Sequence, residues 1–156
     1  MPHIHEKIDF TADAFVVFKG KILLRKHDKY NIWAGIGGHV ELHEDPTEAV
    51  IREAKEETGL DIRLLGPHTT EFDSPRERDL MPPLFLNRHS INSTHEHVDL
   101  LFLATTDTDE IKPGPGEKDV ETHWFTKKEL EDPSLEIPER IRQYALRALE
   151  ESKKWI

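Results

Sequence analysis

The stretch from Gly38 to Leu60 constrains this chain more than any other, and it reads GHVELHEDPTEAVIREAKEETGL. Within it, Glu56 and Glu57 lie three and four residues after Glu53. A helix turns by about 100° per residue, so the three carboxylates would point the same way. Like charges at this spacing destabilise an isolated helix. The crowding of negative charge therefore needs a partner that compensates it.

Start and stop signals for a helix surround these glutamates. Asp45 is a good N-cap, Pro46 suits the first helical position, and Glu48 completes a capping box. Gly59 is a typical residue at which a helix ends. The pattern predicts a helix over residues 46–58.

The apolar side chains of that helix follow helical spacing. Val50, Ile51 and Ala54 form the stripe that we expect to face the core. The glutamates lie to one side of the stripe. The sequence therefore predicts a carboxylate site at the margin of the core.

Length and composition limit the classes of protein. The 156 residues suit a single domain, expected over 1–156. A net charge of −10 argues against stable binding to nucleic acid or to an anionic membrane, because both need basic patches. The absence of cysteine excludes disulfides, thiolate zinc sites and a cysteine nucleophile. No apolar segment has transmembrane length and the N-terminus lacks the features of a signal peptide, so we expect a soluble, cytoplasmic protein.

Strands and helices alternate along the rest of the chain. Residues 14–18 and 21–25 flank the turn signal Lys19-Gly20 and predict a hairpin, after which Trp33 and three glycines form a compact segment. Further strands are predicted over residues 69–72, 98–105 and 121–125, the second of them central. Residues 73–94 read as a long, proline-containing loop with at most one irregular strand. Two helices complete the pattern, a short one opened by a capping box of Thr126 and Glu129, and an amphipathic one after Pro138.

Clustered carboxylates without nearby cysteine favour a hard divalent cation, Mg²⁺ or Mn²⁺. Such a cation would relieve the repulsion, polarise a phosphoryl oxygen and orient a polyanionic substrate. The alternative is a solvated acidic helix face, because glutamate is also a good helix former. On the three glutamates alone, the solvated acidic face is the favoured interpretation.

The wider stretch resembles the signature of the Nudix hydrolases, a glycine and a glutamate followed by Arg-Glu-aliphatic-x-Glu-Glu-x-Gly-aliphatic. The matching positions have fixed offsets and are Gly38, Glu44, Arg52, Glu53, Glu56, Glu57, Gly59 and Leu60. The resemblance implies an α/β fold, the Nudix-type α/β/α sandwich with a mixed central sheet. Two positions depart from the usual pattern: Ala54 is smaller than the common aliphatic, and Ile36 replaces a proline that often precedes the glycines.

The resemblance also implies roles for individual residues. The glutamates of the signature, Glu53, Glu56 and Glu57, would be the catalytic residues and would bind Mg²⁺ or Mn²⁺, together with the carbonyl of Gly37. Glu44 and Arg52 would support the loop and helix through a salt bridge. The implied enzyme is a pyrophosphohydrolase that cleaves a phosphoanhydride of a nucleoside diphosphate linked to another moiety by attack of water on phosphorus.

Residues outside the acidic helix are candidates for contact with the substrate. Arg25 would meet a phosphate, although a surface arginine at a strand end is equally ordinary, and Gly38 lets the backbone approach a ligand. Glu117 is a candidate for substrate binding or for the general base, with Asp119 and Glu121 as alternatives.

Histidines and aromatic residues give weaker signals. His95 and His97 alternate along a predicted strand, but two histidines without a third ligand favour surface residues over a zinc site. Trp33, Phe72 and Phe85 could stack on a nucleobase, but such residues more often belong to the core.

Two functions of different classes remain open. The first is hydrolysis of a nucleotide-derived small molecule, such as a nucleoside triphosphate or ADP-ribose. Pro75, fifteen residues beyond Leu60, resembles a feature of ADP-ribose-cleaving members. The second is a module on the same fold that senses a nucleotide without hydrolysing it, which an intact glutamate set disfavours. The oligomeric state is open, with a homodimer among the alternatives.

Overall fold

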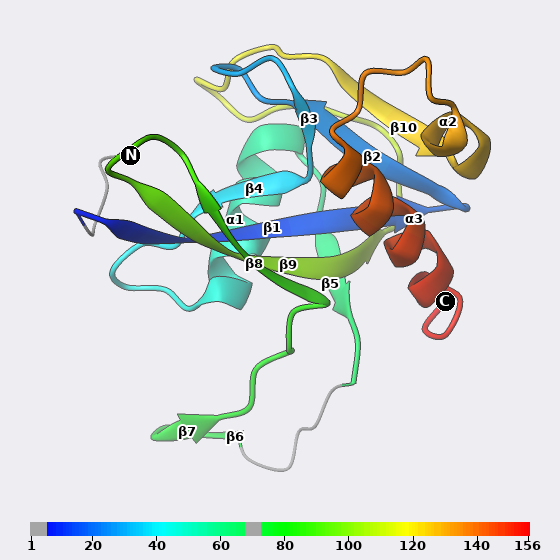
Figure 1. Cartoon of the computed structure of the whole chain (residues 1–156). Coiled ribbons are helices and arrows are strands. Elements are labelled where there is room, and N and C mark those ends of the chain that lie inside the picture. The colour runs from blue at the N-terminus through cyan, green and yellow to red at the C-terminus, as the bar shows by residue number, and fades with distance from the viewer. Residues whose placement is uncertain (1–5, 68–72) are drawn as a thin grey trace.

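The computed structural model describes residues 6–67 and 73–156. A mixed sheet forms its centre, with strands in the order β10-β2-β1-β9-β5 (Figure 1). The two longest strands, β1 (Ile8–Phe18) and β9 (Glu96–Thr106), run parallel at the middle. Their neighbours pair with them antiparallel, and these are β2 (Lys21–Lys26), β4 (Ile36–His39), β5 (Ile62–Leu65) and β8 (Phe85–Ser90).

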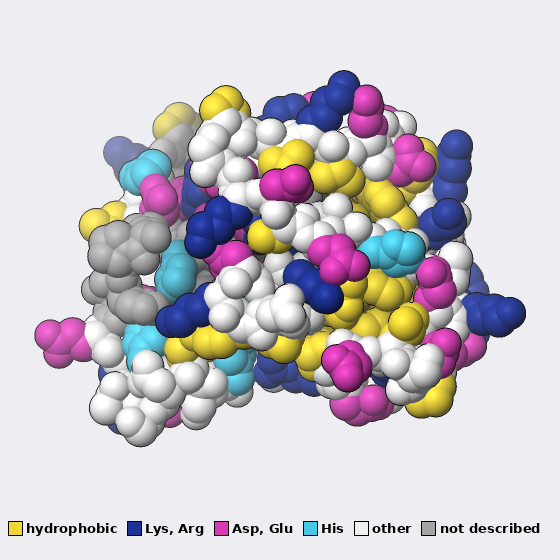
Figure 2. All heavy atoms as spheres, turned by 90° about the horizontal axis from the view of Figure 1, so that it is seen from above, with side chains coloured by type: hydrophobic (Ala, Val, Ile, Leu, Met, Phe, Trp, Pro, Cys, Tyr) yellow, Lys and Arg dark blue, Asp and Glu magenta, His cyan; other side chains and the backbone are white. Residues whose placement is uncertain are grey.

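The remaining elements lie at the edges and on the faces of the sheet. The short strand β3 (Trp33–Ala34) and β10 (Thr122–Thr126) both pair with β2, whereas β6 (Asp73–Ser74) and β7 (Glu77–Arg78) form a separate small hairpin. The helices are α1 (Pro46–Thr58), α2 (Lys127–Glu131) and α3 (Glu139–Ser152). Acidic and basic side chains are interspersed over the face shown in Figure 2.

Alternation along β1 builds a core on each face of the sheet. Ala14 and Val16 pack with the buried residues of α1, whereas Phe15 and Val17 pack with those of α3. Successive side chains of a strand point to opposite faces, so the two helices cover opposite sides. The result is the predicted α/β sandwich with a mixed central sheet.

Several elements lie where the sequence predicts them. The hairpin is formed by β1 and β2, although β1 begins six residues before the predicted start. The helix α1 covers Pro46–Thr58 as predicted, and β9, α2 and α3 match the central strand, the capping-box helix and the terminal helix. The predicted core stripe of α1 is wrong at Ile51, which is 44% exposed, because Ala49 and Val50 face the sheet instead.

The segment after α1 differs most from expectation. The predicted 73–94 loop contains the β6–β7 hairpin and a regular strand, β8, which pairs with β9 along its whole length. β5 is a further strand that the sequence did not indicate. The strand predicted over 69–72 lies outside the described residues. Among the described residues, no helix is long and apolar enough to span a membrane.

Candidate active site

Local sequence fixes both ends of α1 and so fixes the direction of its glutamates. The side chain of Asp45 accepts hydrogen bonds from the backbone N–H groups of Thr47 at 2.8 Å and Glu48 at 3.0 Å. The Glu48 carboxylate accepts in return from the Asp45 N–H at 2.8 Å, which completes the predicted capping box. Gly59 ends the helix with a φ of 76°, a conformation that favours glycine.

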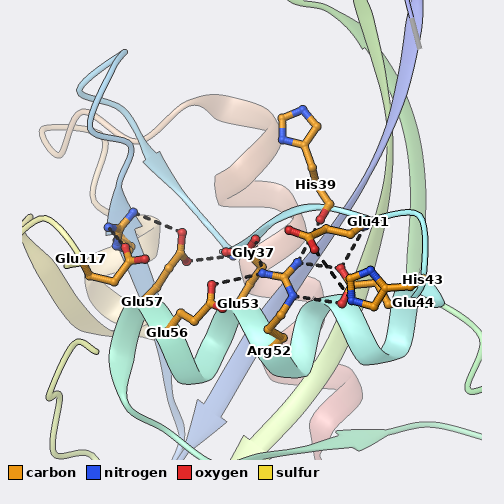
Figure 3. A network of polar contacts seen from close by, with 11 residues as sticks. Gly37, His39, Glu41, His43, Glu44, Arg52, Glu53, Glu56, Glu57 and Glu117 are labelled. Carbon is orange, nitrogen blue, oxygen red and sulfur yellow. Dashed lines mark hydrogen bonds and ion pairs between the residues drawn. The ribbon is translucent and has the colours of Figure 1, made fainter. Parts of the chain in front are cut away.

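The glutamates of α1 face the glycine strand β4 (Figure 3). The Gly37 N–H donates a hydrogen bond of 3.1 Å to Glu57 Oε2. Glu53 and Glu56 each accept from Arg52 Nη1, at 3.0 Å and 3.1 Å. The structure therefore brings together the three glutamates that the sequence singles out.

Arg52 ties this cluster to the loop before α1. Its guanidinium binds the Glu44 carboxylate twice, with Nη2–Oε1 at 2.6 Å and Nε–Oε2 at 3.0 Å. It also donates to the His39 carbonyl at 3.2 Å. The Glu44 hydrogen bonds, followed by the charge of Glu53, raise the pKa of Arg52, so the guanidinium stays charged. The salt bridge implied for Glu44 and Arg52 is thus present.

Burial raises the pKa of two of the glutamates, Glu53 and Glu57. Desolvation raises the pKa of Glu57 to about 8, with Arg25 and the Gly37 N–H opposing that rise and the charges of Glu53 and Glu117 adding to it. Burial likewise raises the pKa of Glu53, against the charge of Arg52. Their negative charge is therefore only partly compensated by the arginines.

The glycines before α1 allow the backbone of β4 to lie close to these carboxylates. A Cβ at Gly38 would lie 2.6 Å from Glu53 Oε1, and a Cβ at Gly37 would lie 2.1 Å from the Ala12 carbonyl oxygen. A larger residue at Gly37 would clash with the backbone of β1, and one at Gly38 would force the Glu53 carboxylate to move, so this close approach depends on both glycines. A hard cation that takes oxygen ligands fits this chemistry.

The structure also places Ile36 and Ala54, which depart from the usual signature. Both side chains are fully buried in the core between α1 and the sheet. Ile36 begins β4, a regular strand that pairs with β1 through Gly38 opposite Ala12. The substitution of proline by Ile36 therefore leaves the glycine segment extended.

Arg25 and Glu117 lie beside the acidic helix. Arg25 Nη1 is 3.4 Å from Glu57 Oε1, and its Nη2 is 3.9 Å from Glu117 Oε2. Arg25 is buried, so the alternative of an ordinary surface arginine is wrong, because β10 and the loop before it cover this strand. Glu121, by contrast, pairs with Lys26 at 3.0 Å and is largely exposed.

Two aspartates that the sequence did not single out lie beneath the glycine strand. Asp13, on β1 opposite Gly37, is buried and shares a hydrogen bond with Asp99 on β9. Burial, then the charge of Asp99, raises the pKa of Asp13 well above its usual range, with smaller effects of Glu57 and Glu53. A signal does exist for Asp99, which is the one carboxylate in the apolar run over residues 98–105, whereas Asp13 comes directly before the run predicted over residues 14–18.

The aromatic candidates lie in the core. Trp33 packs edge-on against Phe125 with ring centroids 5.0 Å apart, and Phe85 stacks on Tyr144 at 4.2 Å. Both are buried, in line with the core alternative, whereas Phe72 lies outside the described residues.

The prediction that His95 and His97 are surface residues is wrong. His95 is only 6% exposed and His97 is half-buried, because neighbouring strands bring other side chains against them. Burial first, and then the neighbouring histidines His39, His89 and His95, lower the pKa of His97 to about 4.

Known structures identify the class of protein. The chain is similar to a hydrolase of the NUDIX family from Clostridium perfringens, with 36% identity, a TM-score of 0.81, and coverage of 91% of this chain and 96% of that one. It is also similar to a MutT NUDIX hydrolase from Burkholderia pseudomallei, with 25% identity, a TM-score of 0.61, and coverage of 93% and 98%.

A sequence match gives the family itself. Residues 9–147 match the NUDIX domain, and the chain belongs to that family. A curated relative, the m7GpppN-mRNA hydrolase NUDT17 of Xenopus laevis, is 37% identical over an alignment of 98 residues that covers 56% of this chain. The match spans only 29% of the length of that relative. The resemblance drawn from the Gly38–Leu60 signature is therefore confirmed at the level of the family.

Proposed function

We propose that this protein is a divalent-metal-dependent hydrolase that cleaves a phosphoanhydride bond in a nucleoside diphosphate linked to another moiety. The observation that carries the proposal is the convergence of α1 on the glycine strand. Glu53 and Glu57 are partly buried there with raised pKa values, which Arg25, Arg52 and the Gly37 N–H oppose without cancelling. Buried carboxylates that repel one another are stabilised by a cation with oxygen ligands.

The residues that would hold Mg²⁺, or Mn²⁺, are Glu53, Glu56, Glu57 and the carbonyl of Gly37. When bound, the cation would polarise a phosphoryl oxygen and balance the charge of the substrate. Arg52 orients Glu53 and Glu56 through Nη1 while its other nitrogens stay bound to Glu44, so the helix and loop keep one geometry.

Arg25 and Glu117 are the residues that we propose for the substrate side of the site. The Arg25 guanidinium is within ion-pair distance of both Glu57 and Glu117, so it can turn from a carboxylate to an incoming phosphate without leaving the cluster. Gly38 has no side chain to obstruct that approach. Glu117 remains a candidate for the general base, since it lies in a loop beside α1.

A hydrolysis screen tests the proposal. The panel holds a nucleoside triphosphate, ADP-ribose, a dinucleoside polyphosphate and capped RNA, each with Mg²⁺, Mn²⁺ or EDTA. Capped RNA is included because the curated Xenopus laevis relative is an m7GpppN-mRNA hydrolase. We expect phosphoanhydride cleavage of at least one substrate that EDTA abolishes.

The same screen separates hydrolysis from nucleotide sensing. Tight, metal-dependent binding of a nucleotide without release of any cleaved product would contradict the proposal and favour the sensing alternative. Cleavage that persists in EDTA would contradict the assignment of a cation to α1.

A further inference from the structure

A group of imidazoles and one carboxylate lies on the sheet away from the acidic helix. We call Asp9, His39, His95 and His97 the histidine cluster. We propose that it is a second, separate metal site that binds a transition-metal ion of the zinc type. Figure 2 shows histidine side chains gathered at one end of the molecule, on the left in that view.

Strand register builds this cluster. Asp9 on β1 is opposite His97 on β9, and His97 is opposite His89 on β8. His39 on β4 is opposite Thr11, one position further along the same face of β1. By alternation this is the face of Phe15 and Val17, which is the opposite side of the sheet from α1. The cluster therefore differs in place and in ligand type from the carboxylates of α1.

Distances within the cluster match the spacing of metal ligands. Single ligand atoms of Asp9, His95 and His97 all lie within 4.8 Å of one another. Asp9 Oδ2 is 3.3 Å from His95 Nε2 and 3.4 Å from His39 Nε2. Bonds of about 2.0–2.1 Å around a tetrahedral zinc ion separate its ligands by about 3.3–3.4 Å.

The ring nitrogens are also oriented for binding. The Nε2 atoms of His39, His95 and His97 are shielded from solvent inside the cluster. His95 Nδ1 is 3.2 Å from the Glu6 carbonyl, which can only accept, so Nδ1 is the nitrogen that donates there, and Nε2, 3.3 Å from Asp9 Oδ2, is the ring atom that would bind a metal. A backbone carbonyl behind a ligating imidazole is the usual arrangement around a bound metal.

The chemistry of the ligands selects the metal. Imidazole nitrogens with one carboxylate favour Zn²⁺ and similar ions, whereas Mg²⁺ prefers oxygen and water. Three ligands, Asp9, His95 and His97, form the closest set, and His39 shares the Asp9 oxygen as a fourth. An ion here would join β1, β9 and β4, the strand that also carries Gly37 and Gly38.

Titration of the purified protein with Co²⁺ alone, and with Zn²⁺ as competitor, tests the proposal. We expect one equivalent of Co²⁺ to give the intense visible absorption of a tetrahedral site, and Zn²⁺ to displace it. Zinc in a hundredfold excess over its Kd should raise the Tm by about 5–10 °C. If the wild-type protein binds Co²⁺ with only the weak absorption of an octahedral ion, that result by itself overturns the proposal.

Variants show which residues bind. His97→Gln and Asp9→Asn should each weaken Zn²⁺ binding by at least about 100-fold, whereas His43→Gln, at a side chain that is 77% exposed, should bind as the wild type does. Glu53→Gln/Glu57→Gln should keep the cobalt spectrum, because the acidic helix is a different site. Circular dichroism checks that each variant is folded.

The N-terminal histidines provide the strictest control. His3 and His5 precede the described residues, and a chain end with two histidines can bind zinc by itself. We expect His3→Gln/His5→Gln to keep the tetrahedral cobalt spectrum. If His3→Gln/His5→Gln loses the tetrahedral cobalt spectrum and His97→Gln keeps it, the assignment to the histidine cluster is overturned.

Discussion

Replacement of Glu57 by glutamine should change how the stability of the metal-free protein depends on pH. Glu57 has a side chain that is only 13% exposed, and burial raises its pKa from 4.5 to about 8. Between these values the folded chain holds a proton that the unfolded chain has released. Stability therefore falls as the pH rises through this window, by about 1.4 kcal/mol for each pH unit.

The size of the effect follows from that slope. From about pH 5.5 to about pH 7.5 the wild type should lose about 3 kcal/mol of stability relative to Glu57→Gln, which carries no titrating group there. Two neighbouring carboxylates act in the same direction, because the Glu57 charge raises the pKa of Asp13 and the Glu53 charge raises the pKa of Glu57. Groups that do not interact with Glu57 cancel when the two proteins are compared.

Urea denaturation in EDTA, followed by circular dichroism at several pH values, measures this difference. Glu131→Gln, at an exposed position of α2, is the matched control and should follow the wild type. Saturating Mg²⁺ should flatten the wild-type curve, because the cation takes the place of the proton. Parallel curves for wild type and Glu57→Gln would refute the claim that this carboxylate is buried among uncompensated charge.

Three further substitutions test the support of the site. Gly38→Ala should weaken Mn²⁺ binding by about tenfold, because its Cβ would lie 2.6 Å from Glu53 Oε1 and displace that carboxylate. Electron paramagnetic resonance measures the binding, and equal affinity for wild type and variant would contradict this role of Gly38. Asp45→Ala should lower the unfolding free energy by about 1 kcal/mol through loss of the α1 cap, and an unchanged urea midpoint would contradict that role. Arg52→Lys cannot keep the two-bond contact with Glu44 and should cost about 1–3 kcal/mol, measured in the same way.

Local signals in the sequence predict α1 well. Its caps, its proline and its final glycine act within a few residues, so Pro46–Thr58 follows from the chain alone. The direction of the Ile51 side chain does not follow from the chain alone, because the rotation of a helix about its axis depends on which of its side chains pack best against the sheet. Here the small Ala49 lies against the sheet and Ile51 turns outward.

Contacts between distant strands are beyond such signals. β8 looks like a loop in sequence because its last four residues, 87–90, are all polar and prolines precede it; pairing with β9 makes it a strand. The same pairing brings His89 beside His97, and the parallel pairing of β1 with β9 brings Asp9 there. Asp9, the residue that the proposed site adds to His95 and His97, is far from them in sequence and is beside them only in the sheet.

The turnover number of Glu53→Gln on the best substrate of the screen, measured with saturating Mg²⁺, tests the central claim most directly. If the acidic helix is the hydrolytic centre, kcat should fall by at least about 100-fold while circular dichroism shows a folded protein, and Glu131→Gln should turn over as the wild type does. A folded Glu53→Gln protein whose kcat stays within about twofold of the wild type would contradict the claim, because no catalytic metal ligand can be lost at so small a cost.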